Sequence, residues 1–199
     1  MKNQFKNKTA LIIGGNSGIG KATAIQLAAQ GAEVYIVGIT ETKLREAKTE
    51  IEKVGNVVAH KIDITNIEEV NQLIKMIQSL SKVDYLVNAS GIFKPKSFLD
   101  HTIVDYDAYL NLNRGFFFLT QAVALKMKAN GGGSIVNVGS MWAKQAIKAT
   151  PSSAYSMQKA GLHSLTQHLG MELADLNIRV NAVSPAVVNT PVYHSVFGG

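Results

Sequence analysis

Short, almost wholly apolar runs alternate with longer amphipathic segments along this chain. Strands without polar alternation are typical of a sheet covered on both faces, and the amphipathic segments between them are typical of crossover helices. Such connections are right-handed in nearly all cases. The pattern predicts an α/β fold in three αβα layers, a doubly wound parallel sheet with helices on both faces. Strands are expected at residues 9–13, 33–37, 57–62, 83–88, 134–138 and 179–183, and a helix at about 41–54.

A single domain over residues 1–199 is the expected organisation. The chain has 199 residues, 46% of them hydrophobic, enough for one buried core. The glycines at 131–133 are interpreted as a connector, because the alternation resumes directly after them. No apolar run approaches the roughly 20 residues that span a bilayer, so no membrane partner is expected. The chain lacks cysteine, which excludes disulfides and thiolate sites and fits a cytoplasmic protein, and no metal site is expected.

The net charge of +6, from 20 Lys and Arg against 14 Asp and Glu, raises the question of an anionic partner. The basic residues are scattered, as at Lys2, Lys43, Lys61, Lys126 and Lys144, with no dense block and no interleaved aromatic residues. This distribution is typical of a solvated surface and argues against nucleic-acid binding. Salt-dependent association with DNA or RNA would support that hypothesis instead.

A glycine cluster lies between the first expected strand and the first helix, where residues 13–20 are Ile-Gly-Gly-Asn-Ser-Gly-Ile-Gly. Glycines permit a tight turn and a close backbone approach, and the helix amino terminus supplies unpaired N–H groups to an anion. A purely structural turn could use the same residues. The position at the first strand-to-helix junction favours a pyrophosphate site.

The spacing of Gly14, Gly18 and Gly20 resembles the Thr-Gly-x-x-x-Gly-x-Gly motif of the classical short-chain dehydrogenase/reductase (SDR) family, with Ile13 in the threonine position. In the family that hydroxyl bonds to neighbouring strands, so its loss implies a less well braced turn. The resemblance implies a Rossmann-like fold that binds NAD(P). The cofactor-binding residues that it implies here are Gly14, Asn16, Ser17, Gly18, Ile19 and Gly20.

Two further segments resemble the family's adenosine site. Asp63, after the third expected strand, matches the aspartate that bonds to the adenine amine, although capping of the helix that begins near Asn66 would explain it equally well. The segment Asn88-Ala89-Ser90-Gly91 resembles the family's Asn-Asn-Ala-Gly with its middle residues changed, and it is expected to line the adenine-ribose pocket and brace the sheet. The residues implied are Asp63, Ile64, Asn88, Ala89 and Gly91.

Tyr155 and Lys159 have the i, i+4 spacing that places two side chains on one face of a helix. Hydride transfer to a carbonyl requires a proton at its oxygen, and a free phenol titrates too high for this work, near pH 10. A neighbouring ammonium would lower the phenol pKa. Such a pair is also common on ordinary protein surfaces, so its context decides the interpretation.

That context resembles the SDR catalytic site. Ser140 ends the fifth expected strand, 15 residues before Tyr155, much as the family's catalytic serine precedes its tyrosine. The resemblance implies that Tyr155 is the general acid or base and that Ser140 positions the substrate oxygen. Lys159 would lower the phenol pKa and hold the nicotinamide ribose, so Tyr155 and Lys159 also count as cofactor-binding residues.

The family also has a catalytic asparagine, which holds a water that links the lysine to solvent. Counting forward from Asp107 selects Asn113, whereas counting back from Gly115 selects Leu112, as if one residue were missing. We assign the role to Asn113, with Asn111 as the alternative. Either asparagine could be an ordinary polar residue of a helix.

Residues 181–190, after the sixth expected strand, resemble the family segment that contacts the nicotinamide. The implied cofactor-binding residues are Pro185, Val188 and Thr190. Ala186 replaces the usual glycine after the proline, which would cost about 1 kcal/mol if a positive φ is needed there. A plain strand-to-loop junction is the alternative explanation.

The residues after the second strand bear on the choice of cofactor. NAD enzymes usually place an acid there, and NADP enzymes a basic residue. This chain has Gly38 and Ile39 at those positions, with Lys43 close behind, which favours NADP slightly over NAD. Met141 and Trp142 either line an apolar substrate pocket or pack as ordinary core residues.

The resemblance covers nearly the whole chain, but family members usually continue into a last helix and strand, which we expect this chain to lack. The leading hypothesis is an NAD(P)-dependent oxidoreductase acting on a small carbonyl or alcohol, as a homodimer or homotetramer. The second is a non-catalytic dinucleotide-binding or sensor protein, favoured by Ile13, Ala186 and the short end of the chain.

Overall fold

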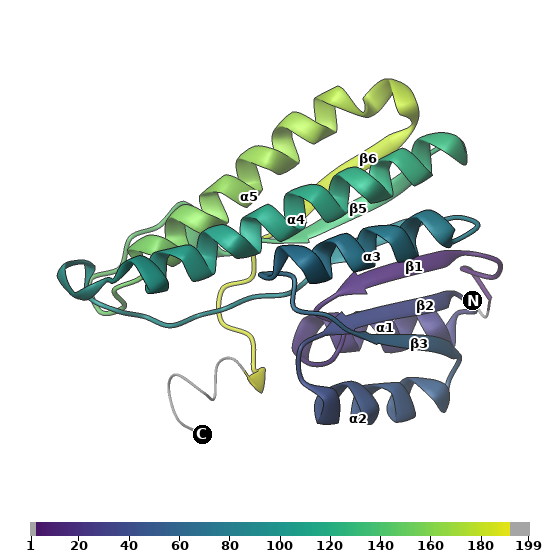
Figure 1. Ribbon diagram of the computed structural model, residues 1–199, viewed down its shortest axis with the longest axis horizontal. Helices are drawn as coiled ribbons and strands as arrows, with labels where there is room; N and C mark the ends of the chain where they lie inside the picture. Colours follow the sequence, from purple (N-terminus) through teal and green to yellow (C-terminus); the bar gives the residue numbers. More distant parts are fainter. Residues whose placement is uncertain (1–2, 192–199) are drawn as a thin grey trace.

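The computed structural model describes residues 3–191, in which six strands form one parallel sheet of order β3-β2-β1-β4-β5-β6 (Figure 1). The α/β fold and its Rossmann-like topology are confirmed. The order reverses between β1 and β4, and a reversal of this kind opens a crevice at the carboxyl ends of the strands. The strands are β1 Thr9–Ile13, β2 Glu33–Gly38, β3 Asn56–Lys61, β4 Tyr85–Asn88, β5 Gly133–Val138 and β6 Ile178–Val183.

Helices cover both faces of the sheet, as the apolar strands require. In Figure 1, α1 and α2 lie on one face, and α3, α4 and α5 lie on the other. Each face has its own buried cluster of apolar side chains. The helices are α1 Gly18–Ala29, α2 Glu41–Glu52, α3 Ile67–Ser79, α4 Ile103–Ala129 and α5 Ser153–Glu172, with short 3-10 turns η1 Phe98–Asp100, η2 Met141–Ala143 and η3 Ala174–Leu176.

The first strand matches its expected range, and the other strands differ from theirs by one or two residues at an end. Val83 was expected in the fourth strand, but the strand begins at Tyr85. Val83 is buried in the core, and Asp84 next to it uses its carboxylate to bind Lys8 and the Thr9 N–H. Burial of an apolar residue is therefore not sufficient to place it in the sheet ladder.

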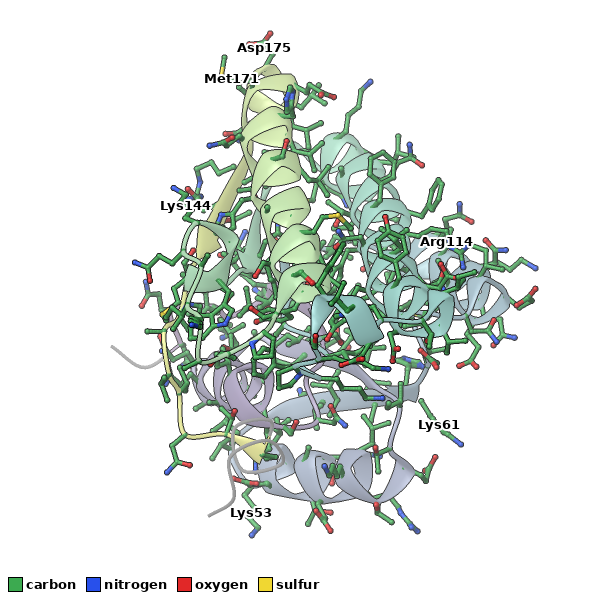
Figure 2. All side chains as sticks on the ribbon, turned by 90° about the vertical axis from the view of Figure 1, so that its left-hand side faces the viewer. Lys53, Lys61, Arg114, Lys144, Met171 and Asp175 are labelled. Atoms are coloured by element: carbon green, nitrogen blue, oxygen red, sulfur yellow. The ribbon has the colours of Figure 1, made fainter. Side chains whose placement is uncertain are left out.

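Charged side chains project from well-separated parts of the molecule. Figure 2 shows Lys53, Lys61, Arg114 and Lys144 pointing outward from different sides. This arrangement agrees with the scattered distribution of basic residues in the sequence. Among residues 3–191, no helix is both long enough and apolar enough to cross a membrane.

Candidate active site

A cleft of about 680 Å³ opens at the carboxyl ends of the strands. It extends from the glycine turn after β1 to the first turn and a half of α5, across the point where the strand order reverses. Three of the expected site residues, Gly20, Asn88 and Asn113, are not among those that line it. The expected residues that line it are Gly14, Asn16, Ser17, Gly18, Ile19, Asp63, Ile64, Ala89, Gly91, Ser140, Tyr155, Lys159, Pro185, Val188 and Thr190.

The glycine turn is closely packed against the backbone around it. Gly14 has φ +88°, and a Cβ built on it would lie 2.5 Å from the backbone N of Ser90. A Cβ on Gly20 would lie 2.2 Å from the carbonyl oxygen of Gly14. Gly20 therefore contributes by letting α1 approach the turn, although it does not line the cleft.

The start of α1 is arranged to receive an anion. Ser17 is the N-cap residue, but its side chain makes no capping hydrogen bond, and the first turn of α1 contains no acidic residue. The first N–H groups of the helix are thus left to a ligand. Ile13, in the family's threonine position, is fully buried, and its backbone pairs with Val37 on one side and Asn88 on the other. The backbone ladder braces this strand end.

Asp63 lines the cleft and organises its own loop. Its Oδ1 accepts hydrogen bonds from the backbone N and the hydroxyl of Thr65, over 2.9 and 2.7 Å. The N-cap of α3 is instead Asn66, whose Oδ1 accepts from the N–H groups of Glu68 and Glu69. The alternative explanation of Asp63 as the helix cap is therefore wrong.

Asn88 braces the sheet from inside. It is fully buried, and its Nδ2 donates to Thr120 Oγ1 over 3.0 Å and to Asn137 Oδ1 over 2.8 Å. Asn137 in turn donates to Thr166 on α5. The network connects β4 and β5 to both long helices, which agrees with the expected bracing role, while Ala89 and Gly91 are the residues of this segment that line the cleft.

Ser140, Tyr155 and Lys159 meet at the other end of the cleft. Ser140 follows β5, its Oγ accepts from the Trp142 N–H over 3.2 Å, and its side chain lies close enough to Tyr155 to lower the pKa of the phenol. The Lys159 ammonium donates to the Val138 carbonyl over 2.8 Å and lies 5.8 Å from the centre of the Tyr155 ring. The hydroxyl, phenol and ammonium that the sequence singled out are therefore brought together.

Burial dominates the protonation of both catalytic candidates. It raises the pKa of Tyr155, the hydrogen bond from Ser140 opposes this, and Tyr109 adds to it. Burial also lowers the pKa of Lys159 to about 8. Lys159 is not among the groups that shift the pKa of Tyr155, because its ammonium is directed to the Val138 carbonyl, so a lowering of the phenol pKa by this lysine stays a prediction.

The three candidate positions on α4 point in different directions. Leu112 is buried and lines the cleft. Asn113 bonds instead to Gln158 on α5, and Asn111 is half-buried and does not line the cleft. A Cβ on Gly115 would lie 2.1 Å from the carbonyl oxygen of Ile64, so this contact fixes the register of α4. Counting back from Gly115 therefore identifies the residue that faces the cleft.

The segment after β6 closes one side of the cleft. Pro185, Val188 and Thr190 line it, and the carbonyl of Pro185 accepts a hydrogen bond from Met141 N over 3.2 Å. Ala186 is not among the described residues with positive φ. The backbone of Ala186 therefore does not carry the strain of a positive φ that was considered for this position.

The sequence did not predict that aromatic side chains would cluster around Tyr155. The Phe93 ring lies edge-on to the Tyr155 ring with centroids 4.8 Å apart, and Trp142 and Tyr109 extend the contacts at 6.5 Å from Phe93 and 6.2 Å from Tyr155. Phe93 and Trp142 line the cleft. The available signal was the position of each residue, just after Gly91 and Ser140, at the carboxyl ends of adjacent strands.

The topology and the glycine turn define a dinucleotide-binding α/β protein, and comparison with known proteins identifies its family. The family model described as short chain dehydrogenase matches residues 8–198. The chain belongs to the short-chain dehydrogenase/reductase family of oxidoreductases.

The similar proteins include enzymes with different substrates. The chain is 35% identical to a 3-oxoacyl-(acyl-carrier-protein) reductase of Thermotoga maritima, over 95% of this chain and 77% of the relative. It is 36% identical to a 7alpha-hydroxysteroid dehydrogenase of Escherichia coli, over 97% of this chain and 76% of the relative. The structure of L-sorbose reductase from Gluconobacter frateurii, complexed with NADPH and L-sorbose, superposes with a TM-score of 0.90 at 29% identity, over 98% of this chain and 75% of that one.

Proposed function

We propose that this chain is an NAD(P)-dependent enzyme that transfers hydride between a nicotinamide cofactor and a small carbonyl or alcohol substrate, with Tyr155 as the acid or base. The observation that carries the proposal is the convergence of Ser140, Tyr155 and Lys159 at one end of the cleft whose other end is the glycine turn. The glycine turn that would hold the cofactor and the side chains that would transfer the proton thus line the same cleft, as this reaction requires.

The residues of the cleft fit a dinucleotide. Gly14 and Gly18 lack the Cβ atoms that would fill the space at the turn, and the start of α1 offers N–H groups to a pyrophosphate. Asp63 would bind the adenine amine, and Val188 and Thr190 would bind the nicotinamide end. When bound there, the nicotinamide ring supplies or accepts the hydride.

Ser140 and Tyr155 would act on the substrate oxygen. The Ser140 hydroxyl and the Tyr155 phenol line the same end of the cleft, so a substrate oxygen placed between them would meet two donors. During reduction the phenol gives its proton to the carbonyl oxygen, and during oxidation the phenolate removes it from the alcohol. Lys159 would hold the nicotinamide ribose and, in its charged form, stabilise the phenolate.

We further propose a preference for NADP, based on the start of α2. Thr40 and Lys43 line the cleft, and the Thr40 side chain makes no capping hydrogen bond with the helix. Glu41, the acidic residue of this first turn, is not among the lining residues. A hydroxyl, an ammonium and free N–H groups are suitable partners for a ribose 2′-phosphate.

The cofactor preference is tested by measuring the affinities of NADPH and NADH through nicotinamide fluorescence. Lys43→Ala should weaken NADPH binding about tenfold, the usual contribution of a charge-assisted hydrogen bond, and leave NADH binding nearly unchanged. The matched control is Lys48→Ala, since Lys48 lies on the same helix and pairs with Glu52. Equal loss of both cofactors in Lys43→Ala, or a wild-type preference for NADH, contradicts the assignment.

Tyr155→Phe tests the reaction itself. The phenylalanine keeps the ring contacts with Phe93 and removes the acidic proton, so turnover should fall by about three orders of magnitude while cofactor affinity stays nearly constant. Turnover is measured with a panel of ketones and secondary alcohols, and affinity by nicotinamide fluorescence. A variant that retains its activity refutes the assigned acid or base.

Two observations favour the second candidate, a non-catalytic dinucleotide-binding protein. The position on α4 that faces the cleft holds the apolar Leu112, and burial raises the pKa of Tyr155 above its ordinary value. Tight NADPH binding by the wild-type protein, without turnover of any substrate in the panel, supports this candidate over the enzyme.

The oligomeric state implied by the family resemblance is proposed on the basis of α4. Leu110, Phe117, Phe118 and Leu125 on this helix are exposed apolar side chains. A second copy of the chain could bury them in a homodimer or homotetramer. Analytical ultracentrifugation of the wild type and of Phe117→Ser tests this assembly, which predicts dissociation of the variant.

A further inference from the structure

Gln158 is a buried amide that has no role in the reaction proposed above. It lies on α5 directly before Lys159 and is 1% exposed. Its Nε2 donates to Asn113 Oδ1 over 2.7 Å, and Asn113 Nδ2 donates to the main-chain oxygen of Gln158 over 3.1 Å. The two amides therefore connect α4 to α5 at the residue that precedes the lysine.

Stability does not explain a glutamine at this position. Its side-chain oxygen is buried and has no hydrogen-bond partner among the described residues. An unpaired buried acceptor is destabilising, and an unbranched apolar side chain of similar length would occupy the same space without one. The reason for a glutamine at this position must therefore lie in the hydrogen bond from its Nε2 to Asn113.

The contact lies where it can control the orientation of α5. Tyr155 and Lys159 are on this helix, three residues before and one residue after Gln158, so any rotation of α5 moves both. The register of α4 is itself fixed by the close approach of Gly115 to Ile64. Asn113 thus presents its amide to α5 from a fixed position.

We propose that Gln158 and Asn113 are a pair of positioning residues, whose bonded amides fix the rotation of α5 and so direct Lys159 toward the bound cofactor and Tyr155 toward the substrate. The inference rests on the proposed function. It gives Asn113 a role that is exerted through Gln158, while Leu112 occupies the place on α4 that faces the cleft.

The first test compares Gln158→Met, Asn113→Ala and the double variant. Gln158→Met, which removes one of the two hydrogen bonds, should lower kcat about tenfold. Asn113→Ala, which removes both, should lower it at least about tenfold, and the double variant should be no worse than Asn113→Ala. The melting temperature of Gln158→Met should stay near the wild-type value, because removal of the unpaired oxygen offsets the lost hydrogen bond to Asn113. The matched control is Gln167→Met, the same change at an exposed position of α5, which should leave kcat unchanged.

The second test measures binding without turnover. NADPH, followed by fluorescence, should bind more weakly to Gln158→Met and Asn113→Ala, whereas ADP, which reaches only the adenosine half of the cleft, should bind as it does to the wild type. In a Lys159→Met background the two substitutions should have no further effect on NADPH affinity, because they act through the lysine.

The results separate this inference from the proposed function. A wild-type protein that binds NADPH but turns over no substrate refutes the proposed function, and the binding comparison then still tests the pair. An active wild type with full activity in Gln158→Met refutes the inference alone. Equal weakening of NADPH and ADP binding, or additive losses in the double variant, would identify a merely structural contact and also refute it.

Discussion

The cleft presents backbone groups at one end and side chains at the other. At the adenosine end, the turn after β1 offers backbone N–H groups, and its shape depends on glycines such as Gly14 and Gly20 that touch other backbone atoms. At the proposed catalytic end, Ser140, Tyr155 and Lys159 would act through their side chains, which α5 and the end of β5 hold in place. A backbone site is therefore limited by steric space, and a side-chain site is limited by helix register.

The largest effect should come from crowding the backbone end. Gly20→Ala places a Cβ against the Gly14 carbonyl oxygen, at 2.2 Å before relaxation, and neither atom can move without shifting the turn. The expected loss is about 3 kcal/mol of unfolding free energy, the upper range for overpacking, together with loss of dinucleotide binding. Urea denaturation and nicotinamide fluorescence measure the two effects.

Gly91→Ala is the matched control for that substitution. Gly91 also lines the cleft, but a Cβ built on it meets no atom within 4 Å. The Gly91→Ala variant should therefore unfold at nearly the same urea concentration as the wild type. If both glycine variants lose the same stability, the distinction between a sterically limited turn and the rest of the cleft is wrong.

The same difference explains which features could be predicted from the sequence. The strands and the glycine turn follow from local composition: continuous apolar runs, and glycines at a strand-to-helix junction. The spacing of Tyr155 and Lys159 follows from the helical period. The position of Asn113 depends on the contact between Gly115 and Ile64, which are 51 positions apart in the chain, so local counting could not choose between Asn113 and Leu112. Similarly, the pKa of Tyr155 depends on burial, which sequence spacing does not report.

Lys159→Met asks whether the catalytic end lowers the stability of the fold. Burial lowers the pKa of Lys159 from 10.5 to about 8, so between these values the unfolded chain holds more protons than the folded one, and wild-type stability rises with pH. At pH 7 the variant should be more stable by about 2 kcal/mol, less than the full linkage value because the bond to Val138 is lost.

Urea denaturation of both proteins at pH 7 and at pH 9.5 measures this difference, which should narrow at the higher pH as the wild-type lysine loses its proton. Lys43→Met, the same substitution at an exposed lysine of the cleft, serves as the control for the loss of a lysine side chain and should leave the urea midpoint near the wild-type value. If the free energies of unfolding of the wild type and Lys159→Met differ by the same amount at both pH values, burial of the charged lysine does not destabilise the fold.

The smallest effect should come from the charged residues Lys8, Lys82 and Asp84, which lie beside the amino ends of the central strands β1 and β4, opposite the cleft. Burial alone would raise the pKa of Asp84, but hydrogen bonds from the Thr9 N–H and the Lys8 ammonium, with the charges of Lys8 and Lys82, lower it. The resulting contribution to the free energy of unfolding is fully present above the unfolded pKa of 3.8 and is lost as the pH falls through the lower folded value.

Asp84→Asn should therefore cost about 1 kcal/mol at pH 7, and less at pH 3, in urea denaturation. Asp100→Asn, at an exposed position in η1, should be neutral at both. Because Asp84 directly precedes β4, at the end of the strand away from the cleft, NADPH affinity should be unchanged. A loss of affinity would show that the two ends of the strands are coupled.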